Sequence, residues 1–187
     1  ITGDATAAYE PQAGLKRYWR HVVYLRPDVW VLIDELRAAQ PSTFDLYFHS
    51  HGSELHSSTF KPDQPFQPDG ARAWTTGGVQ GRLRVTSLYP ADIAGFAELQ
   101  SITDTGGQHE RPMDLLRLRN ARPTRQTVFV TVLEAFPANR KPSACIAIRK
   151  SGARLILEVT QRGRRQRIIA TPFARDADQA ITVSLSR

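Results

Sequence analysis

Three histidines lie close together in the stretch DLYFHSHGSELH, residues 45–56, and their spacing could serve a metal ion. In an extended strand, residues two apart point to the same face, so His49 and His51 could share one ion. Glu54 and His56 follow, but zinc needs three or four ligands, and no strand fixes the direction of these two side chains. We therefore expect His49 to be an ordinary strand-end residue. A metal site centred on His49 and His51 is the alternative.

A second candidate site is the basic stretch QRGRRQR, residues 161–167. We expect Gly163 at the tip of a hairpin, surrounded by Arg162, Arg164, Arg165 and Arg167. Guanidinium groups match carboxylate and sulfate, so these arginines are candidates for binding an anionic substrate. The alternative is a solubilising hairpin whose charges protect a sheet edge. The stretch lacks the aromatic residues on which bases would stack, so we do not expect nucleic acid as a partner.

The third candidate is a pair formed by His21 and Asp34 across one hairpin. Strand-like segments over Lys16–Leu25 and Val29–Arg37 flank the turn Arg26-Pro27-Asp28. If an even-numbered loop joins them, His21 faces Asp34 on an apolar face, where each must satisfy the other. Such a pair could act as an oriented base, or it could fix the register inside a sheet. No serine or cysteine nucleophile lies beside it, so we expect the structural role.

Strand periodicity runs through almost the whole chain and must position these residues. Val, Ile, Leu, Thr and aromatic residues recur in short segments bounded by Gly, Pro, Asp or Asn. We expect one helical turn in Pro90–Leu99 and two long loops, Phe60–Gly70 and Ser101–Pro112. The pattern predicts an all-β fold, an antiparallel β-sandwich with little or no helix. Residues 1–187 form a single domain in this prediction.

Composition narrows the classes of function. The 187 residues are 41% hydrophobic, enough for a core, and no apolar run is long enough to span a membrane. The net charge is +7, and the cations are four lysines and twenty-one arginines, which favours an anionic partner. The single cysteine, Cys145, is expected to be buried and inert. The chain starts at Ile1, and we expect it to be part of a longer protein.

Complete catalytic signatures are missing from the sequence. It contains no phosphate-binding Gly-rich loop, no GxSxG and no HExxH. Asp34 and Glu35 are adjacent, so in a strand they point to opposite faces and cannot act together on one sugar.

A longer pattern resembles a known family. GDATAAY at residues 3–9 is followed by RHVVYLRPDVWVLIDEL at residues 20–36 and FDLYFHS at residues 44–50. This order resembles the C-terminal β domain of heparinase II/III-like polysaccharide lyases. There a Gly-Asp-Ala-Thr stretch precedes an Arg-led strand, a Pro-Asp turn, a strand ending in Asp, and a strand ending near His. The resemblance covers about the first fifty residues.

The resemblance implies a larger bacterial enzyme, with an N-terminal α-helical toroid ahead of the β domain. Such enzymes cleave uronic-acid polysaccharides, including glycosaminoglycans and alginate, by β-elimination. A base removes the proton next to the uronate carboxylate, and positioned donors stabilise the developing charge. The implied partners are the missing helical domain and an anionic polysaccharide, and the implied location is the bacterial periplasm or the outside of the cell.

Few functional residues transfer from the family. Its base and carboxylate neutraliser lie in the helical part, and its structural zinc ligands precede the GDAT stretch. We therefore assign no catalytic residue, zinc ligand or cofactor to this chain. The family-motif positions that transfer, with a structural role, are Gly3, Asp4, Thr6, Arg20, Asp34 and His49.

The sequence thus favours a lyase β domain that is inactive alone and acts as scaffold and cleft wall. A non-catalytic carbohydrate-binding module with an arginine-lined face is the first alternative. The second is a β domain that serves only assembly or polysaccharide export.

Overall fold

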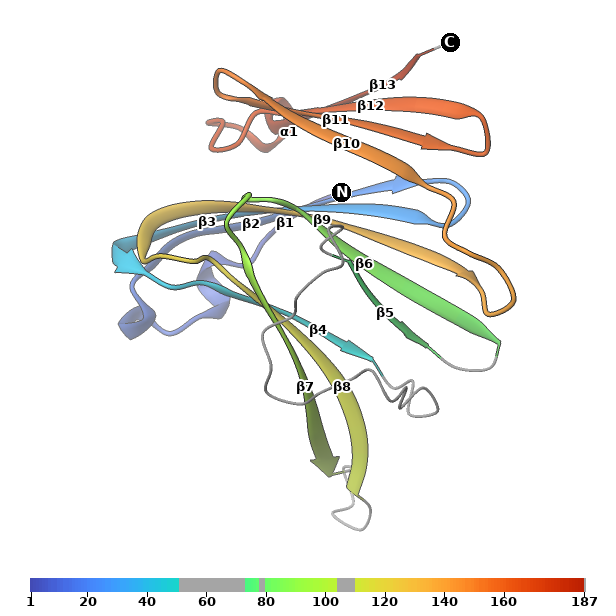
Figure 1. Cartoon of the computed structure of the whole chain (residues 1–187). Helices are drawn as coiled ribbons and strands as arrows, with labels where there is room; N and C mark the ends of the chain where they lie inside the picture. Colours follow the sequence, from blue (N-terminus) through green and yellow to red (C-terminus); the bar gives the residue numbers. More distant parts are fainter. Residues whose placement is uncertain (51–72, 78–79, 104–109, 187) are drawn as a thin grey trace.

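The structure, a computed structural model, describes residues 1–50, 73–77, 80–103 and 110–186 and confirms the all-β prediction. Three antiparallel sheets are stacked in layers, with the six-stranded sheet in the middle (Figure 1). The strands of the middle sheet, in spatial order, are β1 (Thr2–Asp4), β2 (Leu15–Leu25), β3 (Val29–Ser42), β9 (Thr124–Pro137), β6 (Gly81–Tyr89) and β5 (Ala73–Gly77).

The two outer sheets are smaller. The four-stranded sheet consists of β10 (Cys145–Ser151), β11 (Arg154–Gln161), β12 (Arg164–Ala170) and β13 (Ile181–Ser186). The three-stranded sheet has the order β4 (Asp45–Ser50), β8 (Glu110–Arg119) and β7 (Ala94–Thr103). Short helical turns are η1 (Thr6–Ala8), η2 (Pro11–Ala13) and α1 (Ala177–Ala180). No helix among the described residues is long and apolar enough to cross a membrane.

Two hydrophobic cores separate the three layers. One core joins the middle sheet to the four-stranded sheet and includes Val31, Val130 and Leu157. The other joins the middle sheet to the three-stranded sheet and includes Leu36 and Phe129. Because β3 and β9 are covered on both faces, their apolar residues form nearly continuous runs rather than a strict alternation.

The first hairpin differs from the prediction in its register. Its loop is Arg26-Pro27-Asp28, three residues, because Leu25 pairs with Val29. An odd loop shifts the pairing by one residue, so His21 faces Ile33 and Arg20 faces Asp34.

Several local predictions are also corrected. The helical turn expected in Pro90–Leu99 is a turn followed by β7, and the loop expected at Ser101–Pro112 is shorter, because Ser101 pairs with Pro112. Cys145 is exposed rather than buried, since its neighbour Ile146 takes the core-facing side of β10. The loop predicted at Phe60–Gly70 lies outside the described residues.

Candidate functional site

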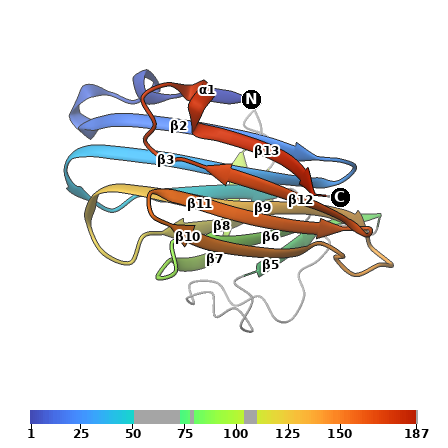
Figure 2. The same ribbon diagram turned by 90° about the horizontal axis from the view of Figure 1, so that it is seen from above.

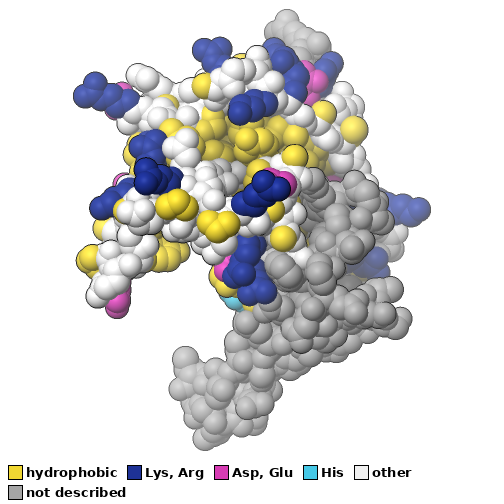
Figure 3. Space-filling model, turned by 60° about the vertical axis from the view of Figure 1, so that its left-hand side comes forward, with side chains coloured by type: hydrophobic (Ala, Val, Ile, Leu, Met, Phe, Trp, Pro, Cys, Tyr) yellow, Lys and Arg dark blue, Asp and Glu magenta, His cyan; other side chains and the backbone are white. Residues whose placement is uncertain are grey.

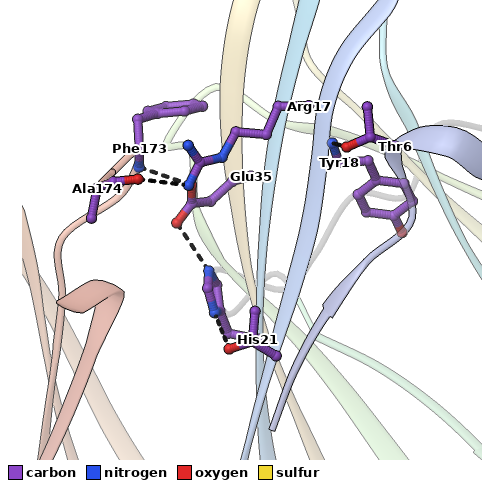
Figure 4. Close-up of polar contacts among 8 residues, drawn as sticks. Thr6, Arg17, Tyr18, His21, Glu35, Phe173 and Ala174 are labelled. Carbon is purple, nitrogen blue, oxygen red and sulfur yellow. Dashed lines mark hydrogen bonds and ion pairs between the residues drawn. The ribbon is translucent and has the colours of Figure 1, made fainter. Parts of the chain in front are cut away.

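A buried carboxylate, Glu35, organises the polar groups at one end of the core between the middle and four-stranded sheets. Its side chain projects from β3 on the same face as Ile33 and is fully buried. Oε1 lies 3.0 Å from Nε2 of His21, and Oε2 lies 2.9 Å from Nη2 of Arg17. Oε2 also accepts the backbone N–H of Phe173 at 2.8 Å (Figure 4). Three charged or polar donors therefore compensate one buried charge.

Arg17 connects this carboxylate to the segment after β12. Its Nη2 also donates to the carbonyl of Ala174 at 3.0 Å, and its guanidinium lies 3.6 Å from the ring centre of Trp19. Phe173 has a left-handed φ of 61°, which costs about 1–3 kcal/mol for a residue other than glycine. The N–H···Oε2 bond to Glu35 holds it there. The cluster thus ties the four-stranded sheet to the middle sheet.

His21 completes the cluster on the side of β1. Its ring is 1% exposed, and Nδ1 lies 2.8 Å from Oγ1 of Thr2. An ionised carboxylate only accepts hydrogen bonds, so Nε2 of His21 donates to Glu35, and in the neutral ring Nδ1 accepts from Thr2. Both ring nitrogens are occupied and sealed from solvent. This arrangement positions β1 and does not leave an imidazole nitrogen for a substrate.

The predicted contact between His21 and Asp34 is wrong. Both side chains are buried, but the register places them on opposite faces of the sheet, and each has another partner. Glu35 takes the place beside His21, and Asp34 Oδ1 accepts from Nε of Arg20 at 2.6 Å. The structural role predicted for the pair belongs to two separate ion-paired groups.

The Arg20–Asp34 pair lies on the opposite face of the sheet, beside Tyr18. Burial raises the pKa of Asp34, although the hydrogen bond and charge of Arg20 lower it in part. Burial, followed by the negative charge of Asp34, raises the pKa of Tyr18 to about 12. Asp34 is fully buried, and a hydrogen bond with the Tyr18 side chain also lowers its pKa in part.

The GDAT stretch folds the N-terminal segment onto β2. Oδ1 of Asp4 accepts the N–H of Thr6 at 2.9 Å, and hydrogen bonds from the Thr6 hydroxyl and from this N–H lower the pKa of Asp4. Oγ1 of Thr6 accepts the N–H of Tyr18 at 2.8 Å. A Cβ added at Gly3 would meet no atom within 4 Å, so sterics do not explain the glycine there.

The basic hairpin forms as predicted, with a two-residue loop between Gln161 and Arg164. Arg162 and Gly163 occupy this loop with positive φ. Arg162 donates to Oδ2 of Asp28 at 2.8 Å, and Arg165 is paired with Glu158. Two of the four candidate arginines therefore already have carboxylate partners. Arg167 lies on the outer face of the four-stranded sheet, beside Glu158 in register.

The histidine candidates for metal binding do not come together in the described part of the chain. His49 is exposed at the end of β4, and its ring stacks on Tyr47 with 6.4 Å between centroids. His51, Glu54 and His56 lie outside the described residues. Within residues 1–50, 73–77, 80–103 and 110–186, no three His, Cys, Asp or Glu side chains could hold one ion.

Sequence reasoning missed the role of Glu35 and Arg17. The signal for Glu35 was a carboxylate within a long apolar run, which demands buried partners. Its partners come from positions far apart in the chain, so local sequence could not identify them.

Comparisons with solved structures point to one group of enzymes. Heparan sulfate lyase HepC from Pedobacter heparinus is similar at 16% identity with a TM-score of 0.55, over 87% of this chain and 25% of that chain. A mutant of HepC is similar at 17% identity with a TM-score of 0.54, over 84% of this chain and 24% of that chain. A heparinase III gene product is similar at 11% identity with a TM-score of 0.56, over 87% of this chain and 24% of that chain. No family model and no curated protein match the sequence.

At these identities the similarity concerns the fold. The predicted resemblance to the β domain of heparinase II/III-like lyases is confirmed at that level. The chain spans about a quarter of the length of the structures that it matches.

We expect Glu35→Gln to destabilise the chain strongly, because it leaves the largely buried Arg17 charge without its carboxylate counterion. Removing one member of a buried ion pair costs roughly 3–5 kcal/mol of unfolding free energy. Glu158→Gln is the matched control, since the Arg165–Glu158 pair lies at the surface, where such pairs contribute little. Chemical denaturation measures both, and equal losses would show that the Glu35 cluster is not a structural anchor.

The raised pKa of Tyr18 predicts a loss of stability in alkaline solution. The folded chain holds the phenol proton with a pKa of about 12, whereas the ordinary value is 10.0. The stability that this supplies is therefore full below pH 10 and is lost as the pH rises from 10 through about 12. Ultraviolet titration of phenolate should show one late component that Tyr18→Phe removes. Tyr24→Phe, at an exposed tyrosine, should leave this component in place.

Proposed function

We propose that this chain is the β domain of a larger polysaccharide lyase that acts on uronic-acid-containing anionic polysaccharides. In that enzyme it acts as scaffold and as one wall of the substrate cleft, and it is not catalytic alone. A helical catalytic domain ahead of it is the proposed partner, and the bacterial periplasm or the outside of the cell is the proposed location.

One observation carries this proposal. The fold matches lyase structures over 84–87% of this chain but over only 24–25% of theirs. Most of each similar enzyme therefore has no counterpart in the 187 residues. A second domain with the catalytic groups accounts for this difference.

The described polar clusters support the scaffold role. β-Elimination needs a base that reaches the proton next to the uronate carboxylate, together with donors that stabilise the developing charge. Glu35 and His21 are buried and occupied by each other, and Asp34 is buried against Arg20. These groups stiffen the domain and cannot meet a polymer.

A carbohydrate-binding module is the second candidate, and the outer face of the four-stranded sheet favours it. The hydrogen bond from Arg165, together with the charges of Arg165, Arg167 and Arg149, lowers the pKa of Glu158. One carboxylate thus lies among three arginines on an exposed sheet surface. A sulfated or uronate chain such as heparin or alginate would find cations there.

The lyase proposal predicts an activity difference between the chain and the longer protein. Incubated with heparin, heparan sulfate or alginate oligomers, the 187-residue chain should release no unsaturated uronate above a blank, because in the proposed enzyme the helical domain supplies the base. The longer protein should release it from at least one of these substrates. Ultraviolet absorbance of the unsaturated product measures both, with boiled protein as the control.

Turnover by the chain alone would contradict the scaffold role. A longer protein that is inactive on all three substrates, while the chain binds them saturably, would favour the binding module.

A further inference from the structure

A groove opens between the middle sheet and the edge of the four-stranded sheet. The four-stranded sheet ends at β10, whereas the middle sheet continues through β6 to β5. Part of β6 therefore lies beside the edge of the four-stranded sheet (Figure 2). The groove encloses about 210 Å³, and its apolar walls include Leu88, Val132 and Ile146. Three polar side chains, Arg84, Thr86 and Glu134, also line it. Ligand sites combine apolar walls and a few polar groups in this way.

The charges in the groove are not paired as the strand register would suggest. Arg84 lies directly across from Glu134 on the neighbouring strands β6 and β9. Oε1 of Glu134 instead accepts the backbone N–H of Ser143 at 2.6 Å and that of Ala144 at 2.9 Å. The carboxylate is thus engaged in fixing the start of β10 over the middle sheet. The guanidinium of Arg84 makes no hydrogen bond or ion pair with any described residue.

A second cation lies next to Arg84 on the same face. Arg82 is two residues away on β6, and residues two apart in a strand project to one side. Its Nε is buried and has no hydrogen-bond partner in the part of the chain that the structure describes. On the face shown in Figure 3, Lys and Arg side chains border a hydrophobic area in the upper half of the molecule. Strand β6 therefore carries two guanidinium groups that have no carboxylate partner among the described residues.

The second oxygen of Glu134 adds an acceptor to the same groove. Oε2 has no hydrogen bond among the contacts of the described residues, whereas Oε1 has its two backbone donors. A carboxylate oxygen accepts from hydroxyl groups but repels an anion. The groove thus presents a cation, a hydroxyl acceptor and an apolar wall within one small space.

We propose that this groove binds one sugar unit that carries a carboxylate or a sulfate. The anionic group pairs with Arg84, a ring hydroxyl donates to Oε2 of Glu134, and the carbon face of the ring packs on Leu88 and Ile146. Arg82 supplies a second cation for the anionic group or for the next unit of the chain. The choice of a saccharide over other hydroxylated anions rests on the proposed function, whereas the preference for an anion rests on Arg82 and Arg84.

Titration of the 187-residue chain, followed by NMR shifts of its backbone amides, tests this site. The probes are glucuronate, glucose 6-sulfate, neutral glucose and the zwitterion leucine. Either anionic sugar should shift the amides of Ser143 and Ala144 in a saturable way, and the two sugars distinguish a carboxylate from a sulfate site. The affinity for glucose should be lower by about tenfold or more, because glucose lacks the charged acceptor that Arg84 binds.

Variants separate the groove from general surface charge. Arg84→Gln should lower the affinity for the anionic sugar about tenfold or more, and Arg84→Lys should restore part of it. Arg125→Gln removes the same charge from an exposed position near the start of β9, nine residues along the strand from Glu134, and should leave the affinity unchanged. Arg84 is only partly buried, so these variants should fold, and their thermal unfolding checks that they do.

Four results would overturn the proposal: no saturable shifts with either anionic sugar, equal affinity for glucose, binding of leucine in place of the sugars, or equal losses in Arg84→Gln and Arg125→Gln. Lyase activity of the longer protein is measured separately. Activity without groove binding would remove only this inference, and groove binding without activity would remove only the proposed function.

Discussion

The need to satisfy one buried carboxylate shapes this fold. Glu35 lies on the central strand β3, where an isolated charge would cost several kcal/mol. Its two oxygens are satisfied only when β2 brings Arg17 and His21, and when the segment after β12 brings the N–H of Phe173. Segments from both ends of the chain must therefore assemble around one side chain. The four-stranded sheet is placed on the middle sheet by this requirement as well as by apolar burial.

The three layers depend on the two central strands of the middle sheet, β3 and β9. β3 and β9 are covered on both faces, so the middle sheet can support an outer sheet on each side. At the edges this coverage ends, and there the chain presents Arg82 and Arg84 on β6 and its basic hairpin between β11 and β12. The centre of the domain is thus closed, whereas the edges expose cations. The proposed role as a scaffold beside a polysaccharide cleft would use both properties.

Sequence patterns predicted the architecture of the domain better than they predicted its side-chain contacts. Alternation and turn residues located β2, β3, β9 and the hairpin at Gly163. The register of the first hairpin failed because the sequence does not state whether Pro27 lies in an odd or an even loop. The segment Pro90–Leu99 was mistaken for a helical turn because its spacing of apolar residues also suits a helix. The Glu35 cluster needs contacts 138 residues apart, which no local pattern encodes.

The central proposal is that a catalytic domain accompanies this chain. The mass of the polypeptide that carries the segment in its source cell tests that claim directly, by an antibody against the chain and a denaturing gel. We predict a band several times larger than 20.9 kDa, because the similar lyases are about four times as long as their matching part. A band at 20.9 kDa would contradict the proposed catalytic domain and would favour a separate binding module.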